Sequence, residues 1–219
     1  MILCMMSLWT IFMCAQQKDV TTFLGIPVDG TRAAMRQKLI QKGFVSKRTT
    51  DGDEYFRGRF NGTNVDVHIA MNNNKVWRLY IADVNTISET DIRIRFNNLI
   101  LQFKNNERYV SWNTNNLIPE NEDISYELLI HNKVYEADFY QQPDSVEFKK
   151  QIMNKLFSKY TPEEMKRWSE DDIVNNSYNL TYDIVKKKSV WFRIFERTGG
   201  YYIGMFYDNE HNGSNGEDL

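Results

Sequence analysis

The histidines are the first side chains to consider for acid–base or metal chemistry, and the chain holds three, His68, His131 and His211. Asp66 and His68 lie two residues apart in an alternating stretch, so they would share one face of a strand. They would supply two metal ligands, or a base with its orienting carboxylate, if His131 approached them from a turn. A polar, solvated strand face explains the same residues more simply, and we predict no catalytic site there.

The carboxyl-terminal stretch matches part of the spacing of a calcium-binding loop. Oxygen-bearing side chains alternate there and a glycine follows, at Asp208, Glu210, Asn212 and Gly213. The twelfth position of such a loop holds a bidentate glutamate, whereas this chain has Leu219. We therefore expect residues 209–219 to form a polar, flexible tail, and we predict no bound metal or other cofactor.

The sequence lacks the motifs of the common enzyme classes. It contains no G-x-S-x-G, H-E-x-x-H, phosphate-binding-loop or dinucleotide-binding pattern. Lys and Arg total 27 and Asp and Glu total 29, a balance that argues against a nucleic-acid partner. The run Lys186-Lys187-Lys188 is explained as a solvated turn between two strands.

Residues 1–15, MILCMMSLWTIFMCA, carry no charged side chain and are nearly all apolar. Spanning a bilayer needs about 20 apolar residues, so this stretch is short for a transmembrane helix. It is typical of an export signal with Ala15 before the cleavage point, although a basic start is missing and Met13 is large for its position. Cleavage there would remove both cysteines and leave a mature chain without a transmembrane span. We expect a periplasmic or extracellular protein, and the alternative is a buried N-terminal segment.

The most regular helical pattern lies within residues 23–44, FLGIPVDGTRAAMRQKLIQKGF. Thr31 occupies the position of an N-cap, and Met35 and Leu39 are spaced to share one helix face. Gly43 suits the left-handed position that ends a helix. The pattern predicts a helix that begins after Thr31, ends near Gly43 and packs one face on a core.

Alternating apolar residues then predict antiparallel strands at residues 54–60, 64–70 and 75–84. Asn61-Gly62, between the first two of them, is typical of a two-residue hairpin turn. One helix followed by antiparallel strands predicts an α+β fold with the helix on one sheet face.

A second helix is predicted to begin after Ser88. Its apolar stripe comprises Ile92, Phe96, Leu99, Ile100 and Phe103. Ile94 and Leu101 lie off this stripe, so we expect the helix to be covered on two sides.

The second half is predicted to continue the same alternation of helices and hairpins. We expect a strand at 108–112, a hairpin of 124–130 and 133–140, helices that open near Asp144 and Thr161, a strand at 180–185, and a hairpin of 189–196 and 201–207. The sequences NKVW at 74–77 and NKVY at 132–135 are a weak internal echo. The predicted fold is α+β, with two helix-plus-antiparallel-sheet units at 16–106 and 107–208 that form a tandem pseudo-repeat in one interpretation.

This order of elements behind an export signal resembles the repeat of the β-lactamase inhibitory protein and of the small outer-membrane-assembly lipoproteins. The segments FLGIPVDGT, VWFRIFE, YYIGMFYDN and NGEDL also resemble uncharacterised exported bacterial proteins. The resemblance covers most of residues 23–219 and implies a fold and a compartment. For the first two groups it also implies binding to other proteins, but no residue role can be transferred.

Aromatic side chains of the predicted strands are the candidates for a binding surface. If one sheet face is uncovered, four of them would form an interaction surface for protein or carbohydrate, namely Trp77, Tyr80, Trp191 and Tyr202. Trp112, Tyr201 and Tyr207 are further aromatic candidates. The alternative is that most of these side chains belong to the core.

The leading hypothesis is an exported, non-enzymatic protein-interaction module that binds an envelope or extracellular protein. One alternative is a carbohydrate- or peptide-binding protein, or a hydrolase whose acidic residues are scattered along the chain. A structural envelope protein is a third reading.

Overall fold

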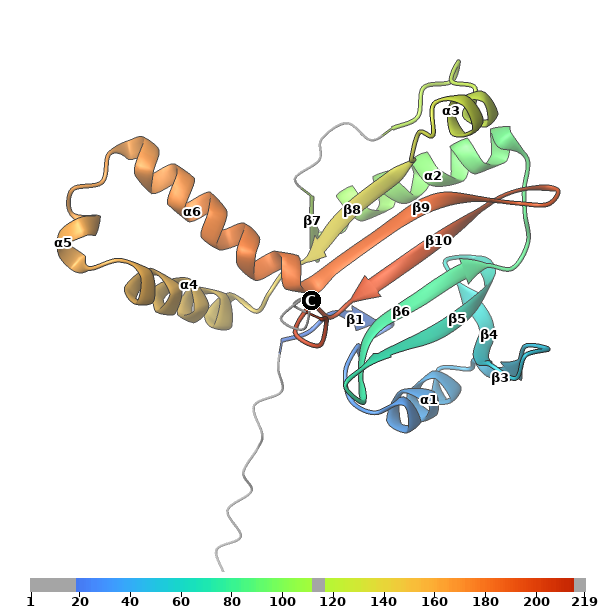
Figure 1. The fold of residues 1–219 in the computed structure, drawn as a ribbon, viewed down its shortest axis with the longest axis horizontal. Helices are drawn as coiled ribbons and strands as arrows, with labels where there is room; N and C mark the ends of the chain where they lie inside the picture. The colour runs from blue at the N-terminus through green and yellow to red at the C-terminus, as the bar shows by residue number, and fades with distance from the viewer. Residues whose placement is uncertain (1–18, 112–116, 215–219) are drawn as a thin grey trace, which may run out of the picture.

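The computed structural model describes residues 19–111 and 117–214 and has an α+β fold. This part of the chain forms an eight-stranded antiparallel sheet, a two-stranded sheet and six α-helices (Figure 1). The expected signal at 1–15 and Trp112 lie outside the described residues. Within 19–111 and 117–214, no helix combines the length and hydrophobicity needed to cross a membrane.

The helices are α1 (Arg32–Gln41), α2 (Glu89–Lys104), α3 (Ile124–Ile130), α4 (Ser145–Lys159), α5 (Pro162–Met165) and α6 (Glu170–Val185), with a 3₁₀ turn η1 at Lys186–Lys188. The small sheet pairs β1 (Thr22–Phe23) with β2 (Ile26–Pro27). The large sheet contains β3 (Val45–Arg48), β4 (Glu54–Phe60), β5 (Thr63–Asn72), β6 (Lys75–Asp83), β7 (Tyr109–Val110), β8 (Glu136–Gln141), β9 (Ser189–Arg197) and β10 (Gly200–Asp208). Its strand order is β3-β4-β5-β6-β10-β9-β8-β7, so β6 and β10 join the two halves at the centre.

The predicted first helix is confirmed as α1. The Thr31 hydroxyl accepts a hydrogen bond at 3.3 Å from a backbone N–H of the first turn. Met35 and Leu39 are both fully buried. Gly43 has a φ of +90°, and the N–H of Phe44 donates to the carbonyl of Leu39 at 3.1 Å, which closes the helix as glycine at this position does.

The second helix, α2, also begins where the sequence predicts. The Ser88 hydroxyl accepts from the N–H of Asp91 and donates to its carboxylate. All five residues of the predicted apolar stripe are buried. The expectation of a second covered side is wrong, because Ile94 and Leu101 are 54% and 46% exposed. One face of α2 packs on the sheet and the opposite face meets solvent.

The predicted hairpins β4–β5 and β9–β10 are confirmed. Asn61 and Gly62 have φ values of +48° and +78°, the left-handed pair that a two-residue hairpin turn requires. The β9–β10 hairpin turns at Gly199 and Gly200. A Cβ on Gly200 would lie 2.5 Å from the carbonyl oxygen of Ile87, so the close approach of these two backbones requires glycine.

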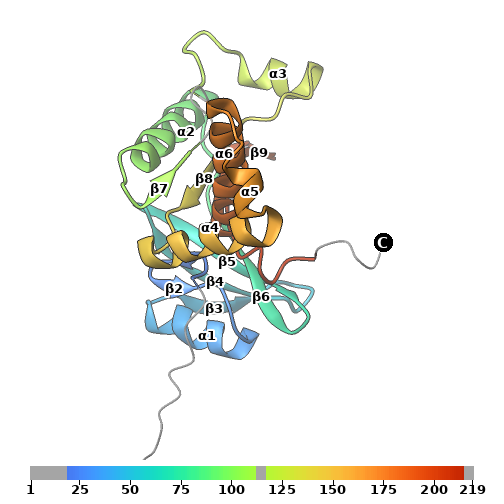
Figure 2. The ribbon, with the colours of Figure 1, turned by 90° about the vertical axis from the view of Figure 1, so that its left-hand side faces the viewer.

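Helices α1 and α2 lie on one face of the large sheet (Figures 1 and 2). Their buried side chains form one cluster with the inward-facing residues of the strands. The strand residues of this core include Val65, Val67, Ile69, Leu79, Ile81, Phe139, Val190, Phe192, Ile194, Ile203 and Met205. The opposite face, which is turned toward the viewer in Figure 1, is not covered by these two helices and is called the open face below.

The predicted hairpin strand at 124–130 is wrong, because this stretch is helix α3. Its sequence ISYELLI alternates apolar and polar residues and therefore fits a strand period. Ile124 and Leu128, four residues apart, are the ones that contact the core. Tyr126 and Ile130 are 50% and 59% exposed, so helical spacing decides which side chains are buried.

The predicted strand at 180–185 is also wrong and forms the end of α6. A capping box between Ser169 and Asp172 starts this helix, and Leu180 and Ile184, one turn apart, are buried. The short apolar run could not be distinguished from a strand by its periodicity alone.

Helices α4, α5 and α6 form an arm that extends from the sheet (Figure 1). Tyr140 at the end of β8 pairs directly with Ser189 at the start of β9, so the arm is an insertion within one hairpin. Helix α4 contains no buried residue. Apolar side chains such as Val146 and Phe157 are 75% and 58% exposed.

The end of the described chain differs from the expected flexible tail. Asn209 is fully buried, and its side-chain amide donates to the carbonyl of Val28 at 2.7 Å. The amide of Asn212 donates to the carbonyl of Val76 at 2.9 Å. These polar side chains satisfy backbone carbonyls of other segments, so their polarity does not imply exposure.

The lysine run at 186–188 is not the solvated turn that the sequence predicts. Lys188 is buried, and its ammonium group donates to Asp19 at 2.6 Å and to the carbonyl of Gln142 at 3.1 Å. The run therefore ties the arm's base to the N-terminal end of the described chain.

Candidate functional site: the open sheet face

Five rings stack side by side on the open face, one from each of five neighbouring strands. Tyr55 stacks on His68 at 5.7 Å between ring centroids, and His68 stacks on Tyr80 at 5.7 Å. Tyr80 then stacks on Phe206 at 4.7 Å, and Phe206 on Trp191 at 3.8 Å. We call these five residues the ring ladder. Strand register produces it, because Tyr80 lies opposite both His68 and Phe206, and Trp191 lies opposite Phe206.

Each ladder residue is partly exposed. Of the four residues predicted to form an interaction surface, Tyr80 and Trp191 belong to the ladder. Tyr202 stacks on Phe195 at 5.4 Å, and Phe195 meets the edge of Tyr80 at 6.4 Å. Three of the four predicted residues therefore lie in one continuous set of ring contacts.

Trp77, the fourth predicted residue, occupies a β-bulge in β6. The pairing of β5 with β6 shifts register at this point, so Trp77, beside Arg78, is the extra residue of β6 and has no directly opposite residue on β5. The Arg78 guanidinium is 4.2 Å from the centroid of the Trp77 ring. By contrast, Tyr201 and Tyr207 are buried in the core on the helix-covered side.

Gly204 provides space for two of these rings. A Cβ at this position would lie 2.5 Å from the Phe195 ring and 2.8 Å from the Tyr80 ring. The rings occupy the volume that any side chain on β10 would need. The absence of a side chain at Gly204 therefore supports the edge contact between Tyr80 and Phe195.

An ion pair lies against the last ring of the ladder. Arg78 donates two hydrogen bonds of 2.6 Å to Asp208, and the indole N–H of Trp191 donates to the same carboxylate at 2.9 Å. The Asp208 side chain is only 2% exposed. The two bonds from Arg78 fix the carboxylate, and its bond from the indole N–H holds the Trp191 ring in one orientation.

A cavity of about 1140 Å³ adjoins Trp191 where β8 meets the arm, and we call it the arm-side cavity. Its ring-bearing lining residues are Tyr140, Tyr178, Tyr182 and Trp191. Its charged lining residues are Arg78, Lys186, Lys187, Glu136, Asp138, Asp208 and Glu210. Arg78 already binds Asp208, and Lys186 binds Asp183 at 2.5 Å, so two of the three cations are engaged by carboxylates.

Two carboxylates of this cavity are held less acidic than usual. Burial raises the pKa of Glu136, and Asp138 adds to the rise while Arg193 opposes it. Partial burial also raises the pKa of Glu210, and the neighbouring Asp208 carboxylate adds to that rise while Arg78 and Lys186 oppose it. Both acids are therefore placed where a further positive charge would be favourable.

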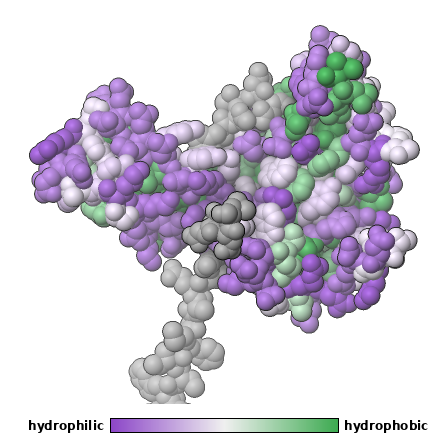
Figure 3. Space-filling view, in the orientation of Figure 1, coloured by the Kyte–Doolittle hydropathy of each residue, from purple (hydrophilic) through white to green (hydrophobic). Residues whose placement is uncertain are grey.

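The surface of the open face is mixed rather than uniformly apolar. Figure 3 shows pale, near-neutral side chains over the sheet with hydrophilic ones around them. The strongest hydrophobic colour in this view gathers over α3, and hydrophilic colour dominates the arm. Aromatic rings beside charged groups are typical of recognition surfaces that stay soluble in the free state.

The structure does not assemble the histidine site considered from the sequence. Both carboxylate oxygens of Asp66 accept hydrogen bonds of 2.8 Å from Arg57, and His68 is stacked in the ladder. His131 ends α3, where it bonds Glu127 at 2.9 Å. In residues 19–111 and 117–214, no three His, Cys, Asp or Glu side chains are grouped to hold a metal ion.

Two ladder residues, Tyr55 and Phe206, were not predicted to belong to a binding surface, and His68 was considered only for acid–base or metal chemistry. The sequence pattern did indicate their orientation, because each lies on the same face of its alternating strand as the polar residues. What the sequence lacks is the register between strands, which decides that these side chains meet.

No protein-family model, curated protein or solved structure matches this chain. The likeness to the β-lactamase inhibitory protein therefore stays a prediction, and the function has to be inferred from the geometry of the open face.

Proposed function

We propose that the protein is an exported, non-enzymatic interaction module whose open face binds an envelope or extracellular protein. The observation that carries this proposal is the ring ladder, which is partly exposed on the sheet face that α1 and α2 leave uncovered. Rings already held by stacking lose little conformational freedom on binding. Rigid aromatic side chains with a polar edge are also the type enriched at protein interfaces.

The partner's chemistry follows from the charges beside the ladder. The arm-side cavity contains two pairs of neighbouring carboxylates, Glu136 with Asp138 and Asp208 with Glu210. In each pair, repulsion by the aspartate contributes to the raised pKa of the glutamate. A lysine or arginine side chain entering this cavity would offset that repulsion. It would also lie beside the ring of Trp191, which attracts cations. We therefore commit to a protein partner that inserts a basic side chain.

Export and internal duplication belong to the same proposal. The uncharged apolar residues 1–15 support export. The predicted units at 16–106 and 107–208 contribute β3–β6 and β7–β10 to the large sheet, and these two sets of strands meet at β6 and β10, which supports a tandem pseudo-repeat. The resemblance to protein-binding groups stated above points in the same direction.

The test begins with capture of binding proteins from envelope and secreted fractions, followed by calorimetry with each purified candidate. The variants are Tyr55→Ala and Trp191→Phe in the ladder, and the matched control is Tyr126→Ala, which removes a 50% exposed ring from α3. We expect either ladder variant to weaken binding by about tenfold, the scale of one interface hot spot, while the control binds normally.

Replacing one basic side chain of the partner should have an effect as large as the ladder variants, and added salt should weaken the complex. Equal binding by the ladder variants and the control would overturn the proposal. Binding of an oligosaccharide in a parallel glycan panel, lost in Trp191→Phe, would favour the carbohydrate-binding alternative, for which the carboxylates and rings of the arm-side cavity are the specific support.

A further inference from the structure

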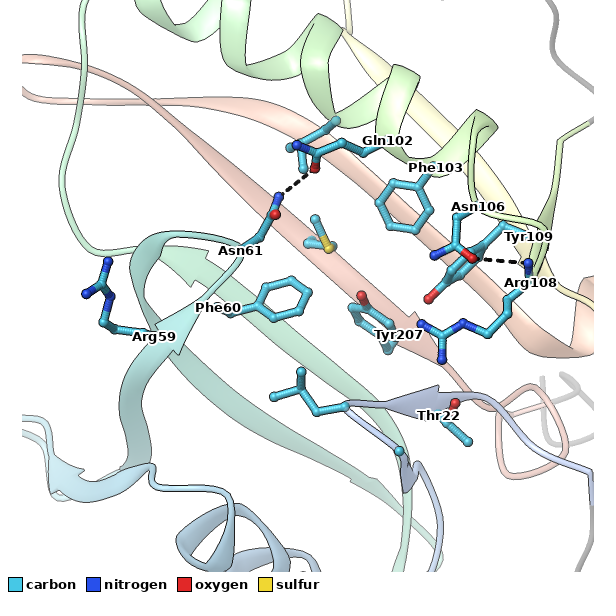
Figure 4. A pocket seen from close by; sticks show the side chains of 14 residues that line it. Thr22, Arg59, Phe60, Asn61, Gln102, Phe103, Asn106, Arg108, Tyr109 and Tyr207 are labelled. Atoms are coloured by element: carbon cyan, nitrogen blue, oxygen red, sulfur yellow. Dashed lines mark hydrogen bonds between the residues drawn. The ribbon is translucent and has the colours of Figure 1, made fainter.

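A second cavity, of about 370 Å³, lies on the helix-covered side of the sheet, opposite to the open face (Figure 4). Its walls come from α2, from the β1–β2 hairpin, from the end of β4, from the segment before β7 and from β10. Small-molecule sites in proteins range from about 300 to 1000 Å³, so this volume suits a small ligand.

One wall of this cavity is apolar. Phe60, Phe103 and Met205 line it, and the ring of Tyr207 forms part of the same surface at 6.5 Å from Phe60. Figure 4 shows the rings of Phe60, Phe103 and Tyr207 arranged around the open volume. The rest of the lining includes polar side chains, namely Thr22, Asn61, Gln102 and Asn106. A ligand that covers the apolar wall must therefore carry an apolar body.

One end of the cavity offers a hydrogen-bond donor. The side-chain amide of Gln141 donates to the Tyr109 hydroxyl oxygen at 3.2 Å. The Tyr109 oxygen accepts this bond, and its own hydrogen can donate to a ligand.

A positive charge lies beside this donor. The Arg108 side chain extends toward Tyr207 in Figure 4 and lines the cavity. Among the residues that the structure describes, no carboxylate forms an ion pair with Arg108, although ten other ion pairs are formed. An apolar wall with a guanidinium and a hydroxyl at one end is complementary to an amphipathic anion, and a planar carboxylate fits the guanidinium fork.

We propose that this cavity binds a small amphipathic carboxylate. Its apolar body contacts Phe60, Phe103 and Met205, and its carboxylate accepts hydrogen bonds from Arg108 and Tyr109. The cavity and the ring ladder lie on opposite faces of the sheet, so this site does not depend on the proposed partner of the open face.

The test titrates the full chain with sodium octanoate, octan-1-ol, octylamine and indole-3-acetate, followed by calorimetry and by the methyl NMR signals of Met205 and Leu99. We expect at least one carboxylate to bind saturably and to shift both signals. The alcohol and the amine of the same length should bind about tenfold more weakly, because neither can form a charge-assisted hydrogen bond between a carboxylate and Arg108.

Two variants test which positive charge binds the carboxylate. Arg108→Gln should weaken octanoate binding by about tenfold and leave octan-1-ol binding unchanged. Arg59→Gln is the matched control, because Arg59 also lines the cavity but bonds the carbonyl of Gly62 at 3.3 Å and points away from the open volume in Figure 4. Failure of every carboxylate to bind, equal affinity for octanoate and octan-1-ol, or equal losses in the two variants would overturn the proposal.

Discussion

Arg78 on β6 and Asp208 on β10 join the two halves of the large sheet through two hydrogen bonds of 2.6 Å. The pair lies at the centre of the strand order, and the Arg78 guanidinium also lies 5.0 Å from the Phe206 ring centroid. A nearly buried carboxylate that holds both an arginine and the Trp191 indole fixes one end of the ring ladder. Its removal should affect both stability and the binding surface.

Asp208→Ala is expected to lower the free energy of unfolding by about 3 kcal/mol, because it leaves the Arg78 guanidinium without its buried counter-charge. Urea unfolding followed by tryptophan fluorescence measures this change. Asp66→Ala is the matched control, since Asp66 binds Arg57 with the same two-bond geometry but Arg57 is 44% exposed. The exposed pair should contribute less than about 1 kcal/mol. Equal losses in the two variants would show that burial does not distinguish these ion pairs.

Gly204→Ala is expected to destabilise the protein by about 1–3 kcal/mol, the usual cost of overpacking a tight site. Its new methyl group would come within 2.5 Å of Phe195 and 2.8 Å of Tyr80, so at least one ring must move. The near-ultraviolet circular dichroism of the stacked aromatic residues should change with stability. Gly213→Ala is a milder comparison, because its nearest contact would be a side-chain oxygen of Glu210 at 3.2 Å. A near-neutral Gly204→Ala would contradict the role of this glycine.

The sequence predicts well those elements in which local and tertiary signals agree. In α1, the Thr31 cap, the buried pair Met35 and Leu39 and the closing Gly43 all favour one helix, and the structure contains it. At Ile124–Ile130 the signals conflict, because alternation favours a strand while the Asp123 cap favours a helix. Packing of Ile124 against the core decides the outcome, and one sequence does not reveal that contact.

The candidate site was predictable only in part for a related reason. Alternation shows which side chains of β6 and β9 share a face, and this led to Tyr80 and Trp191 as candidates. The ladder also needs β10 to pair with β6, and this pairing joins residues more than 100 positions apart in sequence. No local pattern encodes that register, so Phe206, which stacks between Tyr80 and Trp191, was missed.

Replacing residues 144–187 with Asn-Gly is expected to leave the sheet folded. Tyr140 and Ser189 are already paired across β8 and β9, so a short turn can connect the strands where the arm now leaves them. The variant also keeps Lys188, which directly precedes β9, and its bond to Asp19. Amide NMR spectra should retain the dispersed signals of β6, β9 and β10. Loss of those signals would show that the arm is required for folding rather than inserted into a complete sheet.

The arm deletion also separates two parts of the proposed interface. Tyr178, Tyr182 and Lys186 leave the arm-side cavity with the arm, whereas the ring ladder remains. We expect the deletion to weaken the preference for a basic side chain of the partner without abolishing it, because the carboxylates of the cavity remain but lose the wall that shields them from solvent. Unchanged salt dependence and affinity in the deletion variant would argue against binding of the partner's basic side chain in the arm-side cavity.

Acidification is expected to destabilise the protein through His68. Burial between neighbouring rings lowers the pKa of His68, and attraction to Asp66 and Asp53 only partly opposes that shift. The unfolded chain titrates near the ordinary value of about 6.5. Above that value the imidazole is neutral in both states and has no pH-dependent effect. Below it the unfolded state binds a proton that the folded state resists, so stability falls until the pH passes the lowered folded pKa.

His68→Phe provides the matched comparison, because it keeps a ring in the ladder and removes the titration. The free energy of unfolding, measured by urea at about pH 7.5 and about pH 5.5, should fall more in the parent protein than in this variant. Other titrating groups such as Glu136 and Glu210 are present in both proteins, so their contributions cancel in the difference. Parallel pH profiles would show that His68 takes up its proton equally easily in the folded and unfolded states, which its stacking between Tyr55 and Tyr80 argues against.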